Sequence, residues 1–98
     1  MDTLSSKDKH KLRALAHSMK PSVIVGKEGA SESCINSINN TLQVNELIKV
    51  KFNSFKDEKK SIAKQIEESC NATIVGQIGN ILILFRQNSD SDKRKIII

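Results

Sequence analysis

The alternation of apolar and polar residues predicts a first helix that ends before Pro21. Apolar residues recur there at intervals of three and four positions, at Leu12, Leu15, Ala16 and Met19. Ser5 or Ser6 can cap the start of this helix, because a serine side chain accepts a hydrogen bond from the free amides of the first turn. A proline pushes the preceding residue out of the helical region, so the helix cannot run past Lys20.

Two more helices follow from the same spacing. One opens near Ser31, a suitable N-cap, and would bury Ile35, Ile38 and Leu42. The other covers roughly residues 57–69 and is closed by Asn71. Its inner face consists of Ile62, Ala63, Ile66 and Cys70.

Four short runs predict strands, over residues 22–25, 46–52, 72–78 and 81–86. In the second run, Ile48, Val50 and Phe52 alternate with Lys49 and Lys51. Successive side chains of a strand point to opposite faces, so this run predicts a sheet that is covered on one face and open on the other. The last two strands are joined by the dipeptide 79–80, Gly-Asn, which is typical of a two-residue hairpin turn.

The resulting order is α-β-α-β-α-β-β. It predicts a single compact α/β domain with a four-stranded mixed sheet over residues 1–87. Residues 88–98 are polar and then rich in isoleucine, and we expect them to form a flexible basic tail that is disordered or loosely held.

Charge and composition narrow the class of partner. The chain of 98 residues has a net charge of +5, and the positive excess lies in residues 1–20 and 46–60. A polyanion, most commonly a nucleic acid, is one partner that fits; a solvated surface with a modest positive bias is the alternative. The longest apolar runs are far shorter than a bilayer span, and the polar N-terminus does not look like a signal peptide. We therefore expect a cytoplasmic protein with no membrane partner.

The most informative local pattern is a short strand that runs into Gly26-Lys27-Glu28-Gly29 and then into a helix. Glycines let the backbone approach another chain closely, and the amides at a helix start favour an anion. The pattern predicts a loop that holds phosphate, with Lys27 as a full charge at its tip. The alternative is a tight turn that needs two glycines. Glu28 opposes a phosphate unless its side chain points away.

Other cations could extend such a site. On the first helix, steps of four, four and three residues bring a basic stripe to one side, consisting of Lys9, Arg13, His17 and Lys20. On the second strand, Lys49 and Lys51 share a face and could track phosphates. An exposed sheet face, or an edge protected by charge, is the alternative for these two lysines.

No arrangement of residues indicates catalysis or metal binding. His10 and His17 have no carboxylate or cysteine near them at ligand spacing, and Cys34 and Cys70 fit the core as small apolar residues. Only three aromatic residues occur, all phenylalanine, which argues against a sheet that stacks bases on paired aromatic rings. We expect no enzyme, no cofactor, no metal and no small-molecule substrate.

Several motifs in fixed order resemble the CRM domain, and most closely its small stand-alone bacterial form, the YhbY-like proteins. These motifs are residues 12–17 (Leu-Arg-Ala-Leu-Ala-His), 20–21 (Lys-Pro), 25–29 (Val-Gly-Lys-Glu-Gly), 46–51 (Glu-Leu-Ile-Lys-Val-Lys), 78–79 (Ile-Gly) and 84–86 (Leu-Phe-Arg). The resemblance runs from about Leu4 to Arg86. Phe85 stands where a tyrosine is common in the family.

The resemblance implies a fold like the C-terminal domain of bacterial translation initiation factor three, with a Gly-x-x-Gly loop like that of KH domains. It also implies RNA binding, with bacterial members associated with precursors of the large ribosomal subunit. The RNA loop would be Gly26, Lys27, Glu28 and Gly29. We therefore expect a monomeric RNA-binding protein of ribosome assembly that contacts ribosomal RNA. A protein-interaction adaptor on the ribosome or on an assembly factor is the alternative.

Overall fold

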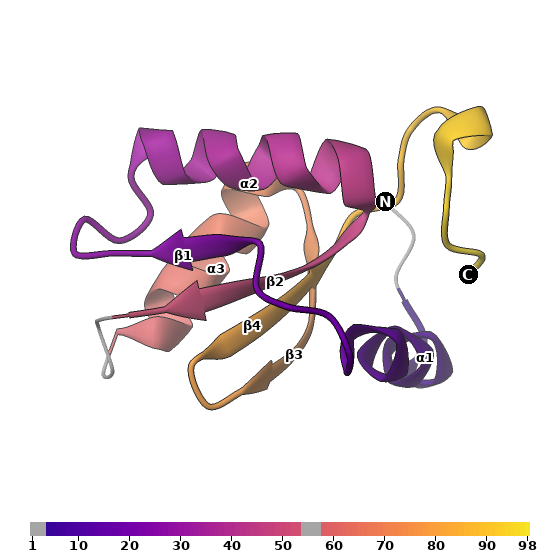
Figure 1. The fold of residues 1–98 in the computed structure, drawn as a ribbon, viewed down its shortest axis with the longest axis horizontal. Helices are drawn as coiled ribbons and strands as arrows, with labels where there is room; N and C mark the ends of the chain where they lie inside the picture. The colour runs from indigo at the N-terminus through magenta and orange to yellow at the C-terminus, as the bar shows by residue number, and fades with distance from the viewer. Residues whose placement is uncertain (1–3, 54–57) are drawn as a thin grey trace.

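The computed structural model describes residues 4–53 and 58–98, which build a mixed sheet with helices on both of its faces (Figure 1). The elements follow the predicted order: α1 (Ser6–Ala16), β1 (Val23–Val25), α2 (Glu32–Asn45), β2 (Leu47–Phe52), α3 (Lys59–Cys70), β3 (Thr73–Ile78) and β4 (Ile81–Phe85). A short 3₁₀ helix, η1 (Ser91–Lys93), follows in the C-terminal segment. The predicted α/β fold with a four-stranded mixed sheet is confirmed.

The strands lie in the order β1-β2-β4-β3. β1 pairs with β2 in parallel, and β4 pairs with both β2 and β3 antiparallel. The register is irregular between Ile74 and Gly76, where β3 has a bulge. β1 is an edge strand of only three residues, and the chain runs from it directly into the glycine loop.

Helices α2 and α3 cover one face of the sheet. Alternation along β2 sends Ile48, Val50 and Phe52 into this core, as predicted. Apolar residues of α2 and α3 meet them there: Ile38, Leu42, Ile62, Ala63, Ile66 and Cys70. The guanidinium of Arg86 links the two helices, since it donates to the carbonyl of Asn39 in α2 and to the carbonyl of Cys70 in α3.

The opposite face is not open along its whole length, and in this respect the prediction from β2 was wrong. Helix α1 packs against β2, β3 and β4 in a second core. The core consists of Leu12, Ala16, Leu47, Val75, Ile83 and Phe85, with Leu4, Met19 and Ile96 packed against it. The prediction rested on the two lysines of β2, which indicate an exposed face. The apolar residues that contact α1 come from three different strands, so no single strand shows that this face is covered.

Helix α1 begins as predicted and ends earlier. Ser5 is the N-cap, and its hydroxyl accepts from the amide of Asp8 while Asp8 accepts from the amide of Ser5. The last helical residue is Ala16, with His17 as the C-cap, so Lys20 lies beyond the helix. Leu15, predicted on the buried face, is 45% exposed.

The other helix ends agree with the sequence. Ser31 caps α2 through a hydrogen bond from the amide of Cys34. Asn71 closes α3 in the left-handed conformation with φ of 50°. The predicted start of α3 at Asp57 lies outside the described residues.

The C-terminal segment, expected to be loosely held, folds back onto the domain in the structure. The carboxylate of Glu46 is fully buried and accepts from the amides of Asn88 (2.7 Å), Lys95 (2.6 Å) and Ile96 (3.1 Å). The ammonium of Lys11 in α1 donates to the carbonyl of Ile97. These contacts join residues far apart in the sequence, which is why the polar composition of the segment did not indicate them. The domain boundary at Gln87 stays a prediction.

Candidate nucleic-acid interface

The glycine loop forms a tight turn at one end of the molecule. The amide of Gly29 donates to the carbonyl of Gly26 at 3.1 Å, so the four residues close on themselves. Gly29 has φ of 64°, a backbone conformation that side chains with a Cβ rarely adopt. Gly26 has no such constraint, and a Cβ added to it would meet no atom within 4 Å. The turn therefore requires glycine at Gly29 only, and at Gly26 the absence of a side chain leaves the backbone open to a ligand.

A surface pocket of about 460 Å³ lies between the loop and the start of α2. Its lining includes the whole loop, the N-cap Ser31, and Ser33 and Ser37 in the first two turns of α2. The first turn of a helix leaves amides without intrahelical partners, which favours an anion. Ser31 itself binds one of them, the amide of Cys34, at 3.2 Å.

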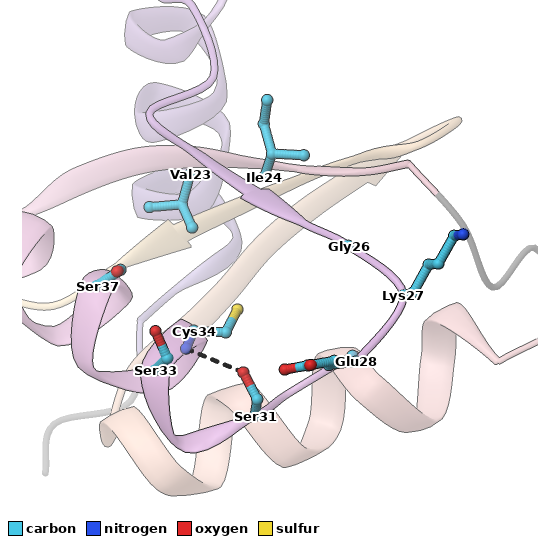
Figure 2. A pocket seen from close by; sticks show the side chains of 10 residues that line it. Val23, Ile24, Gly26, Lys27, Glu28, Ser31, Ser33, Cys34 and Ser37 are labelled. Carbon is cyan, nitrogen blue, oxygen red and sulfur yellow. Dashed lines mark hydrogen bonds between the residues drawn. The ribbon is translucent and has the colours of Figure 1, made fainter.

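The two charged residues of the loop are both exposed and point in different directions. In Figure 2 the carboxylate of Glu28 is directed back toward Ser31 and the start of α2, and the ammonium of Lys27 is directed away from them, toward the end of β2. An anion in the pocket would therefore meet Glu28 before Lys27. The side of the loop that presents Lys27 is the better place for a phosphate.

The predicted basic stripe is only partly formed. Lys9 and Arg13 lie on α1 and His17 caps its end, but Lys20 lies outside the helix. Arg13 has a structural contact as well: it donates to the carbonyl of Val75 at 2.8 Å and passes over Gly76, where an added Cβ would come within 2.9 Å of its Cδ. Its guanidinium thus holds α1 to the bulge in β3.

Lys49 and Lys51 share the α1 side of the sheet but differ in what they contact. The ammonium of Lys49 donates to the carbonyls of Met19 (2.9 Å) and His17 (3.4 Å), which satisfies acceptors just past the end of α1. Lys51 is exposed, and its Cα partner in β1 is Ile24. Lys51 is therefore the lysine of β2 that a ligand can reach.

The loop and α1 do not form one continuous patch. The longest dimension of the molecule is 36 Å, and the loop lies at one end of it while α1 lies toward the other (Figure 1). Lys51 lies beside Ile24 of β1, on the part of the α1 side of the sheet that α1 does not cover.

Sequence reasoning did not assign a role to α3 beside the loop. A Cβ on Gly29 would lie 3.6 Å from Cδ1 of Ile62, so the first half of α3 borders the glycine turn. Lys59 of this helix donates to Gly79 and Asn80 and so holds the β3–β4 hairpin near the same end. The exposed Lys60 and Lys64 add charge to this helix. In the sequence, the spacing of these lysines indicates only a solvated helix face. Their position near the loop depends on how α3 packs in the fold.

The remaining chemistry-bearing residues are structural. Burial raises the pKa of both thiols, Cys34 and Cys70, which keeps them protonated in or beside the core. Over residues 4–53 and 58–98, no three His, Cys, Asp or Glu side chains gather as metal ligands, and no helix is long and apolar enough to cross a bilayer.

Comparison with known proteins decides the family. Residues 4–86 match the CRS1/YhbY (CRM) domain. This chain belongs to the CRM domain family. The resemblance seen in the sequence motifs is thus confirmed, and the matched range ends before the C-terminal segment, residues 88–98, that Glu46 holds.

CRM relatives share most of the chain. A protein of Haemophilus influenzae named as an RNA-binding protein is 38% identical over 92 residues, which cover 93% of each chain. A probable RNA-binding protein of Bacillus subtilis is 30% identical over 90% of this chain and 93% of its own. A probable RNA-binding protein of Methanocaldococcus jannaschii is 40% identical over 85% of this chain and 63% of its own length.

A solved CRM-like structure supports the fold directly. The solution structure of a Staphylococcus aureus protein, described as hypothetical and as a candidate for RNA binding, superposes with a TM-score of 0.79. It is 34% identical to this chain and covers 97% of it.

Proposed function

We propose that this CRM domain binds RNA, and that it grips the sugar–phosphate backbone at the turn Gly26–Gly29. The observation that carries this proposal is the loop geometry: a glycine turn at the entry to α2 in which Gly26 and Lys27 are exposed, while Gly29 is buried and its amide is bonded to Gly26. KH domains clamp single-stranded backbone with a Gly-x-x-Gly loop in this kind of setting. The relatives named as RNA-binding proteins support the same function.

The physiological RNA we propose is ribosomal RNA in precursors of the large ribosomal subunit, as the family resemblance implies. The net charge of +5 favours a polyanion, and none of the four strands contains an acidic residue. Crosslinking the protein to RNA in cells and sequencing the attached fragments tests this proposal. Fragments drawn mainly from messenger RNA or from the small subunit would contradict it.

Lys27→Ala tests the site in vitro. We expect it to weaken binding to a labelled single-stranded RNA and to reduce the slope of log K against log salt by about one, because one phosphate contact and its counterion release are lost. The matched control is Lys93→Ala, which removes another exposed lysine, in the C-terminal segment at the opposite end of the molecule (Figure 1). Equal effects of the two substitutions would reject the loop as the site.

Gly26→Asp is a stronger variant of the same test. The position has open space around it and no positive φ, so the substitution adds charge and bulk with little backbone strain. We expect a larger loss of affinity than for Lys27→Ala with an unchanged unfolding midpoint. Unchanged RNA affinity would show that no phosphate approaches this turn.

A further inference from the structure

One row of side chains crosses the sheet on the same face as α1, in the part of that face that α1 does not cover. The strand register places Ile24 of β1 beside Lys51 of β2, Lys51 beside Ile81 of β4, and Ile81 beside Ile78 of β3. Neighbouring positions in register point to the same face of a sheet. The four side chains therefore lie side by side in the order Ile24, Lys51, Ile81, Ile78.

The direction of this row follows from its neighbours. Val23, Val50, Phe52 and Leu82 point into the core under α2 and α3. Ile24, Lys51 and Ile81 alternate with them and so point to the other face, and Figure 2 shows Val23 and Ile24 on opposite sides of β1. At spacings of about 4.8 Å between strands, the row is roughly 14 Å long.

The row is exposed although it is largely apolar. Ile24 is 57% exposed and Ile78 is 68% exposed, Lys51 is exposed and Ile81 is partly buried. Helix α1 packs instead over the neighbouring positions Leu47, Val75, Ile83 and Phe85. Two large, solvated isoleucines on either side of a lysine are not required by the core, so they indicate a surface that contacts something else.

Its charge and position identify the partner. β1 to β4 contain no acidic residue, and the charged residues in them are Lys49 and Lys51. The row begins at Ile24, two residues before the glycine turn, and ends at Ile78 in β3, the strand whose Val75 is contacted by Arg13 of α1. An apolar platform with a central cation, joined to a phosphate-binding turn, is complementary to an unpaired nucleic-acid strand, whose bases are apolar on their faces and whose backbone is anionic.

We propose that the row Ile24–Lys51–Ile81–Ile78 is a second contact surface for single-stranded RNA, where bases lie against the isoleucines and Lys51 pairs with a phosphate. The inference rests on the proposed function, because the strand is held at the turn Gly26–Gly29 and continues across the row. Aliphatic side chains here take the place of the paired aromatic rings that the sequence lacks. A duplex, whose bases are stacked inside, cannot use this platform.

The test separates apolar from ionic contacts. The double variant Ile24→Thr/Ile78→Thr keeps β-branched residues in the strands, and Val44→Thr alters an exposed apolar residue of α2, away from the sheet, as the matched control. With a labelled single-stranded RNA of random sequence, we expect the double variant to bind about tenfold more weakly with an unchanged salt slope. Lys51→Ala should reduce the salt slope by about one, and Val44→Thr should change neither quantity.

The outcomes distinguish this inference from the proposed function. If Lys27→Ala weakens binding and the double threonine variant does not, the loop binds RNA and the platform proposal is overturned. If the wild-type protein binds no RNA, the proposed function itself fails, and this inference fails with it. Concentration-dependent dimerisation that the threonine variant abolishes, with RNA affinity unchanged, would assign the face to a second copy and also overturn the proposal.

A positional readout does not depend on the stability of any variant. Photocrosslinking of wild-type protein to single-stranded RNA that contains 4-thiouridine, followed by mass spectrometry, should map adducts to the peptides that carry the row. Adducts confined to the loop and α1 would overturn the proposal. A duplex of the same sequence should give no adducts on these peptides.

Discussion

Glu46 is a charged residue that the structure buries completely. It reads in the sequence as a polar start to a strand, yet it caps α2 with φ of 63° and is fully buried. Burial raises the pKa of its carboxyl group, but hydrogen bonds from the amides of Asn88, Lys95 and Ile96 and the charge of Arg94 outweigh this and lower its pKa below the ordinary 4.5. The folded protein therefore favours the ionised form.

This lowered pKa predicts how stability depends on pH. A carboxyl group whose pKa is lower in the folded state contributes stability that is present above its unfolded value and is lost as the pH falls through its folded value. Glu46→Gln keeps the size of the side chain but sets an amide NH₂ against backbone donors. We expect it to lower the free energy of unfolding at pH 7 by about 2 kcal/mol.

The difference between wild type and Glu46→Gln should remain constant down to about pH 4.5 and shrink at lower pH, because protonation removes the advantage of the wild type. Urea unfolding over a pH series measures it. The control is Glu68→Gln, an exposed carboxylate on α3. A difference that does not change with pH would show that the ionised carboxylate is not what holds the C-terminal segment.

At the scale of elements, the two lysines of β2 have different roles: Lys49 stabilises the fold, and Lys51 is available to a ligand. Lys49 donates to the carbonyls of Met19 and His17, so it fixes the end of α1 on the sheet, whereas Lys51 is exposed beside Ile24. We expect Lys49→Ala to lower the free energy of unfolding by about 1 kcal/mol and Lys51→Ala to change it by less than about 0.5 kcal/mol. Urea unfolding of both variants tests this.

Amide hydrogen exchange shows where the effect arises. Lys49→Ala should accelerate exchange in α1 and leave α2 and α3 unchanged, because the lost contact joins only α1 to β2. RNA affinity should fall for Lys51→Ala more than for Lys49→Ala. The reverse order would mean that the ammonium of Lys49 leaves α1 to bind RNA.

The elements themselves could be predicted from local patterns. Caps at Ser5, Ser31 and Asn71, the Gly79-Asn80 turn and the alternation in β2 act over a few residues, and each was identified in the sequence. The position of α1 could not be predicted, because it depends on single apolar residues from three strands. For the same reason Leu15 was misplaced, whereas Lys20 was misplaced because α1 ends at Ala16.

The candidate site was partly predictable. The glycine turn and its exposed Lys27 follow from the motif, but the directions in which the Glu28 and Lys27 side chains point depend on the three-dimensional structure. The row of isoleucines across the sheet was not visible in the sequence at all. It depends on register between four strands, which brings together Ile24 and Ile78 from distant parts of the chain.

At the scale of the whole molecule, the C-terminal segment completes the domain in the structure. Removing residues 88–98 would leave the carboxylate of Glu46 without its three amide donors and would uncover the core around Ile96. We expect this deletion to lower the free energy of unfolding by about 2–3 kcal/mol, because the hydrogen bonds to the Glu46 carboxylate and the apolar contact of Ile96 are both lost. Thermal unfolding of the full and shortened chains measures it.

The matched control for the deletion is the full chain with Glu46→Gln, in which the segment is present but its main contact is weakened. Combining the deletion with Glu46→Gln should cost little more than the deletion alone, because both remove the same interaction. A deletion with no effect on stability would instead support a loosely held tail, as its composition indicates.

The strand order has a consequence for biosynthesis. β4, an inner strand that bonds to both β2 and β3, is the last strand to be translated, so β2 emerges from the ribosome long before its antiparallel neighbour exists. Until residue 85 has been made, β2 lacks its antiparallel neighbour, and β1 and β2 can form only a short parallel pair. The four-stranded sheet can therefore be completed only after β4 has been synthesised.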